Sequence, residues 1–168
     1  MWDPLVRICH WTLVIIVALA WLTREGWSAW HEWLGYGSIV ILAVRIPWGF
    51  FGPVEAPFVN FVRRPGATLS YARRVLAGSE ERHLGHNPLG AWMIVVLLTN
   101  LLLLGFSGWL YTTDRFWGVE WVEHLHGALA DALLVLTGLH IAGVVFASWR
   151  QRESLIAAMV HGRKRPLD

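Results

Sequence analysis

The chain has 168 residues, of which 55% are hydrophobic and 15% are charged, and its formal net charge is +2. A soluble domain of this size is rarely so apolar, so the composition predicts one integral membrane domain covering residues 1–168. The single cysteine, Cys9, excludes a disulfide framework, a cysteine-ligated iron–sulfur cluster and the covalent attachment of a c-type haem.

Four apolar segments approach or exceed the roughly 20 residues that a helix needs to cross a bilayer, at about 3–24, 28–48, 88–111 and 120–149. Asp3 and Asn87 each precede a proline and are expected to cap the first and third helices, and the group Pro47, Gly49, Gly52 and Pro53 is expected to stop the second. The first segment carries His10, so we expect a spanning helix and not a signal peptide. The predicted fold is an all-α membrane four-helix bundle.

Basic residues gather in the loop 52–86 and in the tail 150–168, while the other two connections hold few. The positive-inside rule places this loop and both termini on the cytoplasmic side of the membrane. Short amphipathic helices are expected at 68–77 and 153–161, in contact with lipid headgroups. This distribution explains the basic residues without a nucleic-acid partner. Most of the twelve tryptophans lie near the predicted span ends, which is typical of interfacial belts.

Four histidines lie in or at the ends of the apolar segments: His10, His31, His126 and His140. Antiparallel helices would bring His10 beside His140 near the cytoplasmic face and His31 beside His126 near the outer face. On the fourth helix the 14 residues from His126 to His140 give roughly 21 Å of rise and only about 40° of rotation. Both histidines therefore share one face, which predicts two metal or haem cofactors at different depths in the bundle.

His124 lies two residues before His126, about 200° around the helix, so we exclude it as a ligand. Asp131 falls almost on the face of His124. A carboxylate facing lipid is costly, so we expect these two residues to meet a partner subunit or a second copy of the chain in a homo-oligomer.

Two arginines and three glycines extend this picture. Arg24 follows His10 by 14 residues and Arg45 follows His31 by 14, so each arginine would approach the other haem and pair with its propionates. Snorkelling to the surface is the alternative for both, and it weighs equally for Arg24. Small residues near the histidines would let a flat macrocycle approach the backbone. These are Gly35, Gly127 and Gly138.

Several sequence blocks, in order, resemble the bacterial cytochrome b561 family, which includes the b-type subunits of nickel–iron hydrogenases. They are WDPLVRICHW (2–11), HEWLGY (31–36), GHNPLG (85–90), EHLH (123–126), His140 and GRKR (162–165). The resemblance implies two haem b groups with His10, His31, His126 and His140 as axial ligands, and electron transfer between quinone and a redox partner. The chain is shorter than the hydrogenase subunits, which favours a small complex, with a periplasmic c-type cytochrome or another redox subunit as partner.

Three functions remain open from the sequence. The first is the electron-carrying membrane subunit of a larger oxidoreductase. The second is a stand-alone superoxide:quinone oxidoreductase of the same fold, which the acidic outer loops disfavour because superoxide is an anion. The third is a histidine-relay transporter or proton channel, which predicts no haem and for which no proline-broken helix centre is visible.

Overall fold

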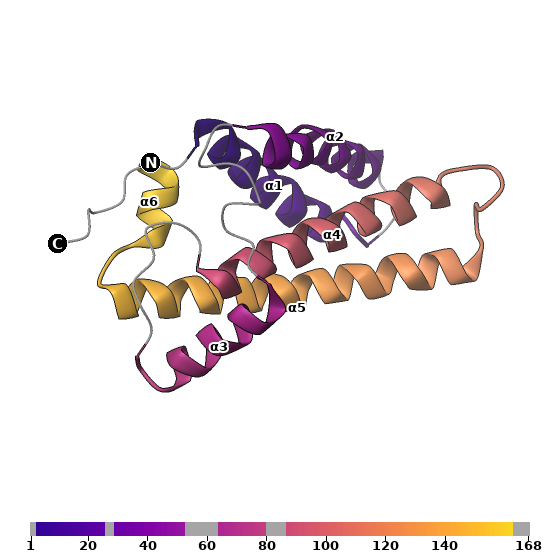
Figure 1. Ribbon diagram of the computed structural model, residues 1–168. Coiled ribbons are helices and arrows are strands. Elements are labelled where there is room, and N and C mark those ends of the chain that lie inside the picture. Colours follow the sequence, from indigo (N-terminus) through magenta and orange to yellow (C-terminus); the bar gives the residue numbers. More distant parts are fainter. Residues whose placement is uncertain (1–2, 26–28, 53–63, 80–86, 163–168) are drawn as a thin grey trace.

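The computed structural model describes residues 3–25, 29–52, 64–79 and 87–162, and these residues form helices and connecting turns. The helices, in chain order, are α1 (Pro4–Leu22), α2 (Ala29–Phe51), α3 (Pro65–Leu76), α4 (Pro88–Tyr111), α5 (Glu120–Gln151) and α6 (Leu155–His161). Four of them, α1, α2, α4 and α5, are long and apolar enough to cross a membrane. The prediction of an all-α membrane bundle is confirmed (Figure 1).

Side-chain caps begin α1 and α4, as the sequence predicts. The Asp3 carboxylate accepts a hydrogen bond from the backbone N–H of Val6 at 2.9 Å, and the Asn87 side chain accepts one from Gly90 at 2.7 Å. Asp3 also accepts from the indole N–H of Trp48 at 3.2 Å. Because Trp48 lies near the end of α2, this contact ties that end to the start of α1.

Of the four residues expected to stop α2, Pro47 and Gly49 lie inside the helix, which continues to Phe51 and so runs about three residues beyond the expected span end at 48. A proline removes a single backbone hydrogen bond, and nearby polar groups or neighbouring helices compensate for this loss inside a membrane. The helix then ends at Gly52, whose N–H still donates to the carbonyl of Trp48 at 2.9 Å. The extra turn carries the indole of Trp48 to Asp3.

The four long helices pack in the order α1, α2, α4, α5, with close backbone approach between each consecutive pair. Figure 1 shows α4 running beside α5 along most of its length, with α1 and α2 together on the other side of α4. One leucine from each long helix forms the centre of the apolar core. These are Leu13, Leu42, Leu101 and Leu133.

Two short helices lie at the end of the bundle where α1 begins. The helix expected at 68–77 is α3, which packs against α4 and buries Tyr71, whereas Leu69 remains 55% exposed. The helix expected at 153–161 is α6, which packs against α5. Predictions that concern Trp2, Trp27 and the basic residues of 53–63, 80–86 and 163–168 lie outside the described residues.

α6 is held against α1 through its last carbonyl groups. The Arg7 guanidinium donates to the Met159 carbonyl at 3.1 Å and also to the Val160 carbonyl, and the Trp11 indole donates to Met159 at 3.5 Å. A cation at a helix C-terminus satisfies free carbonyls and interacts favourably with the helix dipole.

We therefore expect Arg7→Leu to release α6. Loss of these charge-assisted bonds costs about 1.5 kcal/mol, so amide exchange in α6 should quicken by about tenfold while α1 is unaffected. Hydrogen–deuterium exchange followed by mass spectrometry measures both. Arg73→Leu, on the exposed side of α3, is the matched control. Equal exchange in the two variants would show that Arg7 does not anchor α6.

Candidate functional site

The structure brings the four predicted histidines together in two pairs. His10 of α1 lies beside His140 of α5, with ring centres 6.4 Å apart, and we name this pair the His10 layer. His31 of α2 lies beside His126 of α5, with ring centres 6.2 Å apart, and we name this pair the His31 layer. All four side chains are partly buried.

The spacing within each layer fits two imidazoles on opposite sides of one metal ion. With metal–nitrogen bonds of about 2 Å, two such rings have their centres about 6 Å apart. The planes of the rings are inclined at 56° in the His10 layer and 77° in the His31 layer. Axial rings can rotate about their common axis, so these angles are compatible with ligation.

Each layer offers two protein ligands and no more. The described residues contain no group of three or more histidine, cysteine, aspartate or glutamate side chains that would hold a metal ion. A bare zinc ion needs four ligands. A haem brings four in-plane nitrogen ligands of its own and requires only two axial ones, so the donor set fits haem.

The second ring nitrogens of the His31 layer are hydrogen-bonded. The Nδ1 of His31 lies 2.9 Å from the Ala20 carbonyl oxygen, and the Nδ1 of His126 lies 3.1 Å from the Ser107 hydroxyl oxygen. These hydrogen bonds fix the orientation of the two rings, so that the Nε2 atoms are the ones that would bind a metal. Ser107 is 1% exposed, and sequence reasoning missed it.

The helices α1 and α5 meet through their histidine side chains and not through close backbone packing. The backbones of α1 and α5 seldom approach each other, although their histidine rings are adjacent. Gly35, one turn from His31, has nothing within 4 Å of the position that a Cβ atom would occupy. By contrast, a Cβ on Gly108 of α4 would lie 3.0 Å from the His126 ring, so this glycine permits the direct contact of α4 with the ring.

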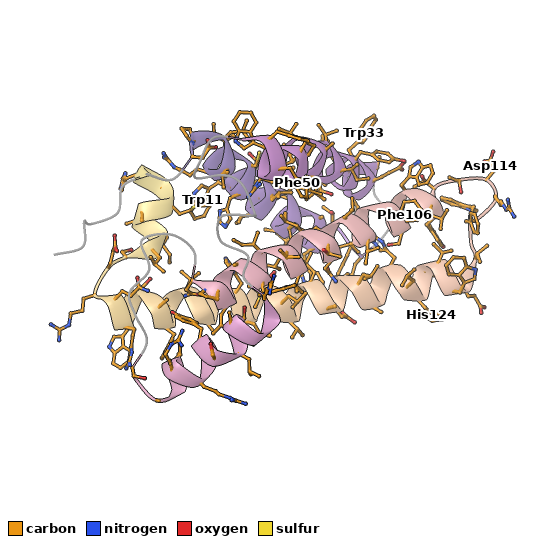
Figure 2. The ribbon with its side chains drawn as sticks, in the orientation of Figure 1. Trp11, Trp33, Phe50, Phe106, Asp114 and His124 are labelled. Atoms are coloured by element: carbon orange, nitrogen blue, oxygen red, sulfur yellow. The ribbon has the colours of Figure 1, made fainter. Side chains whose placement is uncertain are left out.

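Gly127 and Gly138 lie on a different side of α5 from the histidine pairs. They are about 100° and 120° around the helix axis from His126, and both are exposed. His124 and Asp131 share this exposed side, and Figure 2 shows His124 facing away from α4. The exposure of Gly127 and Gly138 does not favour the expected close approach of a haem to the backbone at these two glycines. That approach stays a prediction. The placement agrees with leaving His124 out of the ligand set.

The two arginines differ in their surroundings. Arg45 is 5% exposed, and the Asp3 carboxylate at the start of α1 is close enough to act on its guanidinium, which places Arg45 at the end of the bundle that holds the His10 layer. Arg24 is at the surface, 3.6 Å from the Glu25 carboxylate and stacked 4.3 Å from the ring centre of Trp21. Burial therefore favours Arg45 over Arg24 for the predicted contact with a haem propionate, which stays a prediction.

One polar side chain lies between the two layers. Asn100 of α4 is 9% exposed, and its carbonyl oxygen has no hydrogen-bond partner among the described residues. Asn100 and Ser107 lie in a nearly continuous run of apolar residues. Polar residues in such a span are often functional, so this pattern could have identified both as candidate site residues.

Comparison with known proteins agrees with this geometry. A search of protein-family models matches residues 1–162 to the family described as Prokaryotic cytochrome b561. Comparisons with curated proteins and with solved structures give no match. With nearly the whole length matched, four long apolar helices and two imidazole pairs, the chain belongs to the prokaryotic cytochrome b561 family of membrane b-type cytochromes, which bind haem b and transfer electrons.

Proposed function

We propose that this chain is a dihaem cytochrome that carries electrons across the bacterial cytoplasmic membrane, between the quinone pool and a redox partner outside. The observation that carries the proposal is the presence of two imidazole pairs, both spaced for one metal ion. His10 and His140 are the proposed ligands of one haem, and His31 and His126 of the other.

The four histidines would determine the kind of chemistry. Bound haem supplies a one-electron iron couple. Two imidazoles from the chain would hold each haem and leave no position on its iron for oxygen or substrate, so the group would supply electron transfer without bond formation at the metal. The chain's own task is to hold the rings and to exclude water.

The two layers would lie near opposite faces of the membrane. They are separated by 14 residues of α5, or roughly 21 Å of helix rise. The leucine core, with Leu101 and Leu133, belongs to the apolar interior of the bundle. With two sites at these depths, an electron would cross the bilayer in several short transfers. A single site would leave at least one longer transfer.

Charge supports an orientation with the His10 layer toward the cytoplasm. Exposed arginines at that end include Arg73, Arg74, Arg150 and Arg152. The other end exposes more carboxylates than cations: Glu25, Glu32, Asp114, Glu120 and Glu123 against Arg24 and Arg115. Figure 2 shows Asp114 on the connection between α4 and α5 at this end. An acidic surface favours a basic redox protein, such as a c-type cytochrome, over anionic superoxide.

Haem stoichiometry and spin state of the purified chain test the proposal. We expect a pyridine haemochrome assay to give two haem b per chain, and electron paramagnetic resonance to show low-spin signals without carbon monoxide binding after reduction. Quinol added to membrane vesicles should reduce the haems. One haem per chain, or a high-spin site that binds carbon monoxide, would contradict the assignment of two histidine pairs.

A further inference from the structure

The two histidine layers differ in what holds the second nitrogen of each ring. In the His31 layer both Nδ1 atoms have an oxygen within hydrogen-bond distance, from Ala20 and from Ser107. In the His10 layer the Nδ1 of His10 is buried and has no hydrogen-bond partner among the described residues. The two proposed haem sites are therefore chemically unequal, although each has two imidazoles.

The directions of the hydrogen bonds in the His31 layer follow from the partners. A backbone carbonyl only accepts, so the Nδ1 of His31 carries a proton. The Ser107 hydroxyl has one proton, which it donates to the Leu104 carbonyl of its own helix at 2.9 Å. In the proposed ligation the Nε2 of His126 binds the metal, so its Nδ1 carries the proton and the Ser107 oxygen accepts from it. Both hydrogen bonds favour the tautomer in which Nε2 is unprotonated and can bind a metal.

The packing around Ser107 leaves little freedom for another arrangement. Its neighbour Gly108 allows α4 to touch the His126 ring, and a Cβ on Gly105 would lie 2.8 Å from Ile39 of α2. α4 is therefore fixed against both α2 and α5 at this level. The hydroxyl of Ser107, at 1% exposure, is kept away from water that would compete for its bonds.

We infer that Ser107 is a positioning residue that sets the reduction potential of the His31 layer, and that this layer has the lower midpoint potential of the two. An acceptor on the distal N–H makes an imidazole a stronger donor, which stabilises oxidised iron. The His31 layer has two such acceptors, whereas His10 has none in the described part of the chain. This inference rests on the proposed ligation by histidine pairs.

The test is a spectroscopic redox titration of the purified haem-loaded chain. We expect two midpoints, and Ser107→Ala should move the lower one to a more positive potential while the upper one stays. The low-spin resonance signal of the same haem should change in its g values. The His126→Ala variant assigns the midpoints, because the lower one should be missing from it.

Ser38→Ala is the matched control. Ser38 is also a buried serine, 7% exposed, and its hydroxyl donates to the Gly35 carbonyl of its own helix at 2.7 Å, but no hydrogen bond joins it to any of the described histidines. We expect neither midpoint to move. If Ser107→Ala shifts the potentials no more than Ser38→Ala does, or if the lower midpoint persists in His126→Ala, the inference is wrong. Such a result with two low-spin haems present would leave the proposed function intact, whereas a missing haem in the unmodified chain would contradict that function.

Discussion

The His126→Ala variant is expected to purify with one haem per chain, while His124→Ala retains both. Haem b is held without covalent attachment, so removing one of two axial ligands should allow the group to dissociate during purification. The histidine substituted in each case lies on the same turn of α5, but only His126 faces a second imidazole, at 6.2 Å between ring centres. The pyridine haemochrome ratio to protein measures the outcome.

The same pair of variants distinguishes ligation from general damage. His124 is exposed, so its loss should leave the helix content and the melting temperature unchanged. If both variants lost haem equally, the assignment of His126 by position on the helix face would fail. Retention of two low-spin haems by His126→Ala would show that another residue serves as the ligand.

Gly35→Leu is expected to exclude haem from the His31 layer without unfolding the chain. No atom lies within 4 Å of an added Cβ at this position, so the substitution meets no protein. Replacing a helical glycine by leucine also raises helix propensity by roughly 0.8 kcal/mol. A leucine side chain would, however, fill the open space one turn from His31. We expect the haem ratio to fall to one while the helical circular dichroism is preserved.

Gly127→Leu is the comparison for this experiment. Gly127 has the same open surroundings and gains the same propensity, but it lies on the exposed side of α5 with His124. Both haems should therefore remain. Loss of haem from Gly127→Leu would instead show that a haem lies against the backbone at Gly127, as its position beside His126 in the sequence suggests. If Gly35→Leu keeps both haems, the space beside Gly35 is not the haem site.

The histidine pairs were predictable because helix geometry alone determines them. The rise and rotation over 14 residues place His126 and His140 on one face, and antiparallel neighbours bring His10 and His31 to matching depths. The same 14-residue spacing predicts that Arg45 lies near the other histidine pair from His31, and Arg45 is buried at the end of the bundle that holds the His10 layer. Gly127 follows His126 directly in the sequence, but the rotation of about 100° per residue turns it toward a different side of α5.

What the sequence did not predict depends on how α4 meets its neighbours. Ser107 bonds to its own helix like many membrane serines, and only the register of α4 against α5 brings its oxygen to His126. The continuation of α2 past Pro47 likewise needed tertiary information, because a proline ends helices in water far more readily than between packed helices in a membrane.

The sparse backbone contact between α5 and the α1–α2 hairpin has a consequence for biogenesis. Among the described residues, α5 is joined to the rest of the bundle mainly by α4, by the two histidine pairs and, at one end, by α6, so the α1–α2 and α4–α5 hairpins meet chiefly where α2 packs against α4. Each haem would clamp α5 to α1 or to α2, and binding energy would thereby become folding energy. Cells starved of haem should accordingly accumulate a protease-sensitive chain, and supply of haem after synthesis should rescue it.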